Sequence, residues 1–118
     1  MLTTSYYAKL KKIQKPVAIS VGVPKWYSGA DYDTLAPPYT IVSAYKRGII
    51  SDEVFTSEFY KSVLSKLNPL NVYNDIISRF GDDATLICYE KPGDFCHRRL
   101  VAKWFEDNLN IEVPELIF

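Results

Sequence analysis

The chain has 118 residues, of which 47% are hydrophobic and 24% charged, and its 14 basic and 14 acidic side chains cancel. A chain of this size and composition folds as one globular domain without needing a metal or a disulfide, and its balanced charge gives no field that would attract nucleic acid or an anionic membrane. It contains neither the roughly 20 apolar residues of a membrane-spanning helix nor the apolar core of a signal peptide, so we expect a cytoplasmic protein. We expect its two cysteines to stay reduced there. We also expect a single domain over residues 1–118.

The first part of the chain predicts a short helix, a strand and a long loop. Apolar side chains recur at helical spacing over residues 5–13, and Pro16 prevents the helix from continuing. Residues 17–23, VAISVGV, are apolar with little alternation, which is typical of a strand covered on both faces. Residues 24–39 are rich in Gly, Pro, Asp and aromatic residues without periodicity and indicate a loop, whereas residues 41–45 fit either a short strand or one helical turn.

The second part of the chain has clearer periodicity. In chain order it predicts a helix over residues 51–67, a helix over residues 70–80, a buried strand over residues 84–89, a helix after Asp94 and a short strand over residues 111–113. Gly81 is suited to end the second of these helices, and the Asp94 carboxylate is suited to cap the amides of the next one. The alternation of strands and helices predicts a three-layer α/β domain with a small, mainly parallel sheet of about three to four strands flanked by helices.

Both cysteines, the only histidine and two adjacent arginines lie within residues 84–103. Cys88 and Glu90 share one face of the predicted strand because side chains alternate along a strand. The cluster lies where a strand ends and a helix begins, which is where open α/β sheets bind ligands and where free helix amides favour anions.

A helical wheel places the side chains of the predicted helix. His97 falls within its apolar stripe, with Cys96 at one edge and Arg98 at the other, whereas Arg99 falls on the solvent side. Three interpretations follow for this cluster. In the first, Cys96 is a nucleophilic thiolate favoured by the helix start and the neighbouring His97 and Arg98, with Cys88 as a second thiol or a core residue.

The second interpretation is a zinc site with Cys88, Cys96 and His97 as ligands and Glu90 or water as the fourth. The ligand types suit zinc, but neighbouring positions on a helix diverge by about 100°. Cys96 and His97 would therefore converge on one ion only if the helix began after them. On this ground we predict no metal and no cofactor.

The third interpretation is anion recognition at the helix start. The Arg98 guanidinium and the free amides of the first turn would hold a phosphate or carboxylate, and His97 would donate a hydrogen bond to it. The structural alternatives are an ion pair of Arg98 with Glu90 or Asp94, and a core His97 hydrogen-bonded to a carbonyl. The loop over residues 24–39 leaves the carboxyl end of the predicted first strand and carries Lys25, Trp26 and Tyr27. We expect this loop to form a lip over the same edge of the sheet.

The segment LICYEKPGDFCHRRLVAKW resembles the signature of the domain-of-unknown-function family 488, in which an apolar strand ends in Cys-x-Glu and a Cys-His-Arg triplet opens the next helix. The resemblance to compact members extends over residues 35–37, 60–64 and 113–115. Longer members carry an Asp-Val-Arg segment after their first strand, which residues 21–25 of this chain lack. The resemblance implies a fold and a site but no particular reaction.

We therefore expect a small α/β protein that binds, and if it is an enzyme transforms, an anionic or phosphorylated small molecule such as a nucleotide or nucleoside derivative. The expected ligand-binding residues are Arg98, Lys25, Trp26 and Tyr27, and the expected catalytic residues are His97, Cys96 and Glu90. Transfer or hydrolysis at a glycosidic or phosphate bond is the first reaction class to test. The alternatives are non-catalytic capture of the ligand and a protein-interaction module with a structural Cys/His cluster. Nothing in the sequence indicates an oligomeric state.

Overall fold

The structure is a computed structural model that describes all residues from Met1 to Phe118. Its strands and short 3-10 helices are β1 (Thr3–Tyr6), η1 (Tyr7–Lys12), β2 (Pro16–Ala18), β3 (Ala30–Asp31), η2 (Asp33–Leu35), η3 (Leu64–Lys66) and β4 (Thr85–Cys88). Its α-helices are α1 (Tyr39–Lys46), α2 (Asp52–Ser62), α3 (Pro69–Phe80) and α4 (His97–Leu109). None of these helices combines the length and the apolar surface that crossing a lipid bilayer requires.

The four strands form one parallel sheet in the order β1-β4-β2-β3. β4 lies between β1 and β2, and Thr85 is opposite both Thr3 and Pro16. All four residues of β4 are buried, because neighbouring strands and both covering layers enclose it. The predicted α/β fold with a small parallel sheet, and the predicted buried strand near residues 84–89, are confirmed.

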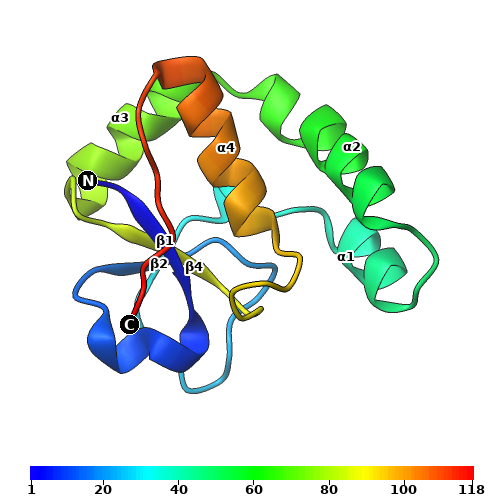
Figure 1. Ribbon diagram of the computed structural model, residues 1–118, viewed down its shortest axis with the longest axis horizontal. Coiled ribbons are helices and arrows are strands. Elements are labelled where there is room, and N and C mark those ends of the chain that lie inside the picture. The colour runs from blue at the N-terminus through cyan, green and yellow to red at the C-terminus, as the bar shows by residue number, and fades with distance from the viewer.

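The two faces of the sheet are covered by different layers. Val17 and Leu86 face the larger core, to which α2, α3 and α4 contribute side chains such as Phe59, Ile76 and Phe105. The neighbouring residues in the strands point the other way. They belong to a smaller core closed by η1 and by the loop that follows β2, which consists of Tyr7, Ile13, Ala18, Tyr27 and Ile87. The sheet is therefore the middle layer, and the site described below lies at the end of β4 where α4 begins (Figure 1).

The amino-terminal part differs from the sequence prediction. A helix was expected over residues 5–13, but β1 occupies Thr3–Tyr6 and only the 3-10 turns of η1 follow. Pairing of β1 along the edge of β4 is a long-range interaction that outweighs the local helical spacing. The strand expected over residues 17–23 spans Pro16–Ala18, and the chain turns at Gly22 with a φ of 70°.

The helices of the middle of the chain agree with their predicted positions. The region expected to be helical over residues 51–67 forms α2 and η3, and the helix expected over residues 70–80 is α3. Gly81 ends α3 with a φ of 100°, as expected of a helix-ending glycine. Residues 41–45, for which the sequence favoured no single structure, belong to α1.

The end of the chain forms no strand over residues 111–113, and instead Glu115 forms an isolated parallel bridge with Thr4 of β1. The Glu115 carboxylate accepts two hydrogen bonds from Arg98 of α4, one from Nε at 3.0 Å and one from Nη2 at 2.9 Å. It also accepts a bond of 2.6 Å from the Thr4 hydroxyl. The Arg98 side chain is 1% exposed and that of Glu115 is 18% exposed, so this ion pair joins three segments away from water.

The buried ion pair also sets the ionisation of Glu115. Burial raises the pKa of this carboxyl group, but hydrogen bonds from Arg98 and Thr4 and the charges of Arg98 and Arg99 outweigh burial, so that its pKa lies below the usual value. The ionised form is therefore favoured in the folded protein.

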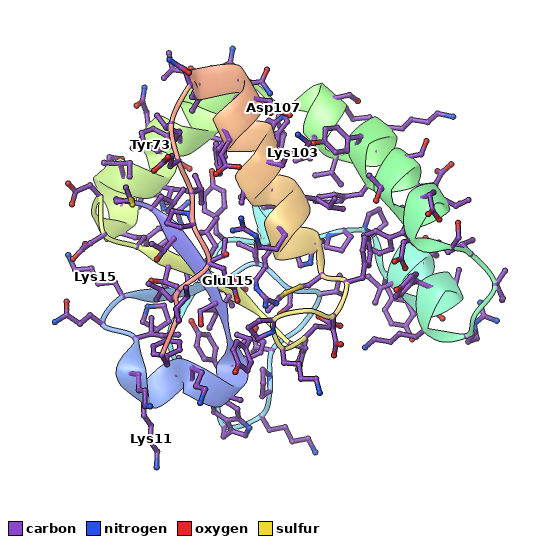
Figure 2. All side chains as sticks on the ribbon, in the orientation of Figure 1. Lys11, Lys15, Tyr73, Lys103, Asp107 and Glu115 are labelled. Atoms are coloured by element: carbon purple, nitrogen blue, oxygen red, sulfur yellow. A yellow bond between two sulfur atoms is a disulfide. The ribbon has the colours of Figure 1, made fainter.

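We expect Glu115→Gln to lower the free energy of unfolding by about 2 to 4 kcal/mol, because the substitution leaves the buried Arg98 charge without its counter-ion. Urea denaturation measures the change. The matched control is Asp107→Asn on α4, whose carboxylate pairs with Lys103 at 3.2 Å on the exposed surface (Figure 2). This control is expected to change stability by less than about 0.5 kcal/mol.

The same pair of variants tests the pH dependence. The contribution of Glu115 is present in full above its unfolded pKa of about 4.5 and is lost as the pH falls through the lower folded pKa. Glu115→Gln should lack this part of the acid dependence, whereas Asp107→Asn should retain it. Equal losses of stability in the two variants at neutral pH would contradict the role given to the ion pair.

Candidate functional site

The site begins where the chain leaves β4 and ends where it enters α4. α4 starts at His97, and Cys96 is its N-cap residue with extended backbone angles, φ −149° and ψ 139°. The prediction that Asp94 caps this helix is wrong. The amide of Asp94 instead donates to the carbonyl of Lys91 in a turn that includes Gly93 at a φ of 93°, so the helix begins later than expected.

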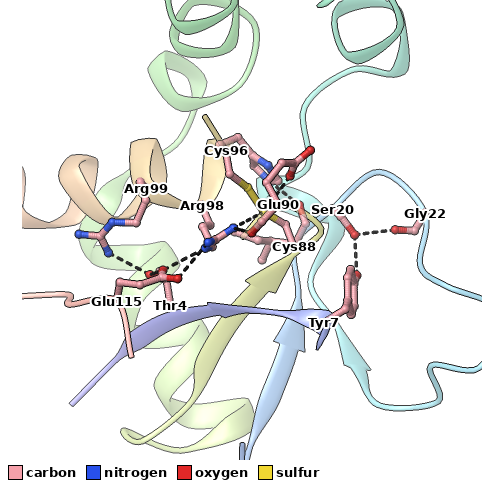
Figure 3. Close-up of a disulfide and its surroundings, with 12 residues drawn as sticks. Thr4, Tyr7, Ser20, Gly22, Cys88, Glu90, Cys96, Arg98, Arg99 and Glu115 are labelled. Carbon is pink, nitrogen blue, oxygen red and sulfur yellow. Dashed lines mark hydrogen bonds and ion pairs between the residues drawn. A yellow bond between two sulfur atoms is a disulfide. The ribbon is translucent and has the colours of Figure 1, made fainter. Parts of the chain in front are cut away.

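The late helix start turns Cys96 towards the end of β4. Its sulfur is bonded to that of Cys88 in a disulfide, with the two Cα atoms 7.4 Å apart (Figure 3). The expectation that both cysteines stay as thiols is therefore wrong for this structure. Two charged side chains border the disulfide: Arg98 Nη1 lies 3.4 Å from the Cys88 sulfur, and Glu90 Oε2 lies 3.8 Å from it.

His97 lies beside the disulfide with its ring buried, as the wheel predicted. Its Nε2 atom is 2.7 Å from the carbonyl oxygen of Ile19, and because a carbonyl only accepts hydrogen bonds, Nε2 carries the hydrogen. Burial, together with the charge of Arg98, lowers the pKa of His97 to about 4 against the opposing effect of the Ile19 hydrogen bond. At neutral pH the ring is therefore uncharged, with a free lone pair on Nδ1.

The two arginines of the Cys-His-Arg-Arg segment both serve the fold. Arg98 donates to Glu115 through Nε and Nη2, and its Nη1 also donates to the carbonyl of Glu90 at 2.6 Å (Figure 3). Arg99, expected on the solvent side, instead donates from Nη1 to the Thr4 hydroxyl at 2.9 Å and to the Val113 carbonyl at 2.8 Å. The wheel missed these contacts because they involve the carboxyl-terminal segment, which has no periodic pattern.

A small pocket opens to solvent beside the disulfide. The three predicted catalytic residues, Glu90, Cys96 and His97, all line it. The rest of its wall comes from the loop after β2, the end of β4, α1 with the residues before it, α2 and the loop before α4. It consists of Ser20, Val21, Pro37, Val42, Tyr45, Lys46, Phe55, Cys88, Tyr89 and Phe95. Sequence reasoning missed the α1 wall, although the apolar segment over residues 41–45 was the signal that could have indicated it.

The loop residues predicted to bind ligand do not line this pocket. Lys25 and Trp26 are exposed, and Tyr27 is buried with its hydroxyl donating to the Ala30 carbonyl. The Trp26 ring contacts that of Tyr7 at a centroid distance of 6.1 Å. Tyr7 in turn contacts Tyr89 of the pocket wall at 4.8 Å, so one aromatic ring separates the loop from that wall. Arg98 also lies outside the lining, behind the disulfide.

Comparison with known proteins gives one match. The family model DUF488-N3a, described as the active DUF488-N3 subclade, matches residues 7–109, a range that includes every residue of the pocket and ends before Glu115. No curated protein and no solved structure matches the chain.

We expect Arg98→Lys to lower the free energy of unfolding by about 2 to 3 kcal/mol even though the positive charge is kept. The single nitrogen of a lysine ammonium cannot occupy the three positions from which Nε, Nη1 and Nη2 of Arg98 donate to the Glu115 carboxylate and the Glu90 carbonyl. Arg99→Lys is the matched control, because Arg99 uses a single nitrogen that an ammonium can replace, and it should lose less than about 1 kcal/mol. Chemical denaturation measures both, and equal losses would refute a structural role specific to Arg98.

Proposed function

The chain belongs to the DUF488 family, and we propose that it binds an anionic small molecule, such as a nucleotide or nucleoside derivative, in the pocket at the start of α4. The observation that carries the proposal is the combination of an aromatic wall, a rim cation and two unused acceptors around one opening. Pockets of this kind, mostly apolar with a few polar groups placed together, are the usual form of small-molecule sites.

The aromatic wall suits a planar ring. Tyr45, Phe55 and Phe95 pack against one another with ring centroids 5.2 to 5.5 Å apart. Such a cluster offers faces and edges on which a base or another flat group can stack. Two of the three rings come from α1 and α2, on the side of the pocket away from the polar cluster at the end of β4. A flat group of the ligand can therefore bind here while its polar groups contact that cluster.

Positive potential is available at two places near the opening. Lys46 of α1 is exposed and lines the pocket, with its ammonium 5.8 Å from the centre of the Tyr89 ring. At the start of α4, no backbone carbonyl accepts from the amide of His97, which is a residue of the pocket lining. Free amides and the positive end of the helix dipole stabilise anions. These groups replace Arg98 in the role of anion holder, because the Arg98 side chain is engaged in the buried ion pair.

Two acceptors face hydroxyl groups of a bound ligand. Glu90 offers its carboxylate at the pocket wall, and neutral His97 offers the lone pair of Nδ1. Ser20 is not free for this purpose, because its hydroxyl donates to the Gly22 carbonyl and accepts from Tyr7. Two acceptors beside a cation match the hydroxyl and phosphate groups of a sugar phosphate.

Chemical transformation of the ligand would use the same residues. A neutral imidazole can take a proton, and the Glu90 carboxylate can orient a hydroxyl or a water molecule. Cys96 can act as a nucleophile only after its disulfide to Cys88 is reduced. Capture without turnover needs none of these steps, so the two functions are separated by the fate of the ligand.

We expect nucleoside phosphates or sugar phosphates to raise the melting temperature in thermal-shift measurements, and Lys46→Gln and Phe95→Leu to weaken the affinity about tenfold each. The matched controls are Lys25→Gln and Trp26→Leu in the loop outside the pocket, which should leave the affinity unchanged. The opposite pattern would move the ligand to the loop. If no member of the panel binds, the proposal is overturned and a protein-interaction module becomes the leading alternative.

Turnover is measured with the ligand that binds most tightly. Product formation that His97→Gln abolishes, with ligand affinity retained within about threefold, supports an enzyme. Recovery of the ligand intact after prolonged incubation with the reduced protein supports capture.

A further inference from the structure

We propose that the reduced protein holds a zinc ion through the sulfurs of Cys88 and Cys96 and a ring nitrogen of His97, with a fourth coordination position open to the pocket. The ligand atoms of these three buried residues lie within 4.8 Å of one another. Two thiolates and an imidazole are the ligand types that zinc prefers among the common divalent ions. The inference stands on these residues and not on the proposed organic ligand; in the zinc-bound form, the His97 nitrogen and the Cys96 sulfur serve the metal and are not free for that ligand.

The backbone at the start of α4 makes this convergence feasible. Two neighbouring residues inside a helix point about 100° apart and could not share an ion. Cys96, however, is extended and lies just outside the helix, so its side chain can approach that of His97. The Cα atoms of Cys88 and Cys96 are 7.4 Å apart, wider than the roughly 4.4 to 6.8 Å usual for bonded cysteines, so the two sulfurs can separate to hold an ion once their bond is reduced.

The surroundings of His97 are those of a metal ligand. The hydrogen bond from Nε2 to the Ile19 carbonyl fixes both the tautomer and the orientation of the ring, and it leaves Nδ1 as the only lone pair. Histidines that bind metals almost always donate their other ring N–H to a carbonyl or carboxylate in this way. Because the ligand atoms of Cys88, Cys96 and His97 lie within 4.8 Å of one another, a small reorientation brings them to one ion.

The charges around the cluster also balance when an ion is bound. Two thiolates neutralise Zn²⁺, and Arg98 is already neutralised by Glu115, so no net charge is buried. Arg98 Nη1, 3.4 Å from the Cys88 sulfur, can donate a hydrogen bond to the thiolate. Three protein ligands with the fourth position facing a pocket is the arrangement of zinc sites that bind or activate water or substrate.

Metal binding requires reduction of the disulfide. A dithiol reductant transfers two electrons and two protons to the Cys88–Cys96 bond, which gives two thiols, and the reductant itself becomes a disulfide. Zn²⁺ then displaces the two thiol protons and forms two Zn–S bonds. The oxidised protein has no thiolate to offer, so occupancy of the site follows the redox state.

The first test measures metal content directly. Protein reduced with a phosphine, incubated with zinc and freed of excess metal is expected to retain about one zinc ion per chain by elemental analysis, and the oxidised protein is expected to retain none. Replacement by cobalt should give thiolate-to-metal charge-transfer bands and the visible absorption of a tetrahedral site. A folded, reduced chain that shows neither zinc retention nor these bands overturns the proposal without any variant.

The second test assigns the ligands. Competition with a chromophoric chelator should show zinc affinity reduced at least tenfold in Cys88→Ser, Cys96→Ser and His97→Gln. Tyr45→Phe, which lines the same pocket but removes no metal ligand, should leave the affinity unchanged. Circular dichroism confirms folding of each variant. Zinc affinity that persists in all three ligand variants assigns the ion to another part of the chain and overturns the proposal.

Discussion

The buried pair of Arg98 and Glu115 is the interaction on which the arrangement of this protein depends. An arginine taken out of water is very costly unless its charge and its donors are satisfied, and here a carboxylate takes two of the donors while the Glu90 carbonyl takes a third. These acceptors come from the carboxyl-terminal segment and from the loop after β4. The first turn of α4 is therefore held against both, and the residues on either side of Arg98 have little freedom to move.

The chemistry of the site follows from where the helix begins. Cys96 lies just before α4 and has an extended backbone, whereas His97 is the first residue of the helix. The directions of their side chains are therefore not related by the helical rotation of about 100° per residue. This difference brings both side chains to the Cys88 sulfur, which a continuous helix over the same residues would not allow. The opposite wall of the pocket is formed by side chains of α1 and α2.

Much of the core fold could be predicted from local pattern, and the failures share one cause. β4, α3 and its end at Gly81 were readable because periodicity and a helix-ending glycine are properties of neighbouring residues. β1 was missed because it is stabilised by pairing with a strand some eighty residues away. The grouping of Glu90, Cys96 and His97 was predicted from the strand-loop-helix order. The pairing of Arg98 with Glu115 could not be predicted, because Glu115 lies in a segment without periodicity.

Arg98 touches the Glu115 carboxylate with one end of its guanidinium and lies against the Cys88 sulfur with the other. A group shared in this way is thermodynamically linked to both neighbours. If the sulfur becomes a thiolate, it competes for the positive charge that holds the carboxyl-terminal segment. By reciprocity, if reduction of the sulfur weakens the contact with that segment, loosening the segment changes the sulfur's preference between its oxidised and reduced forms by the same free energy. Arg98 is therefore the one side chain that contacts both the carboxyl-terminal segment, through Glu115, and the Cys88 sulfur at the centre of the site.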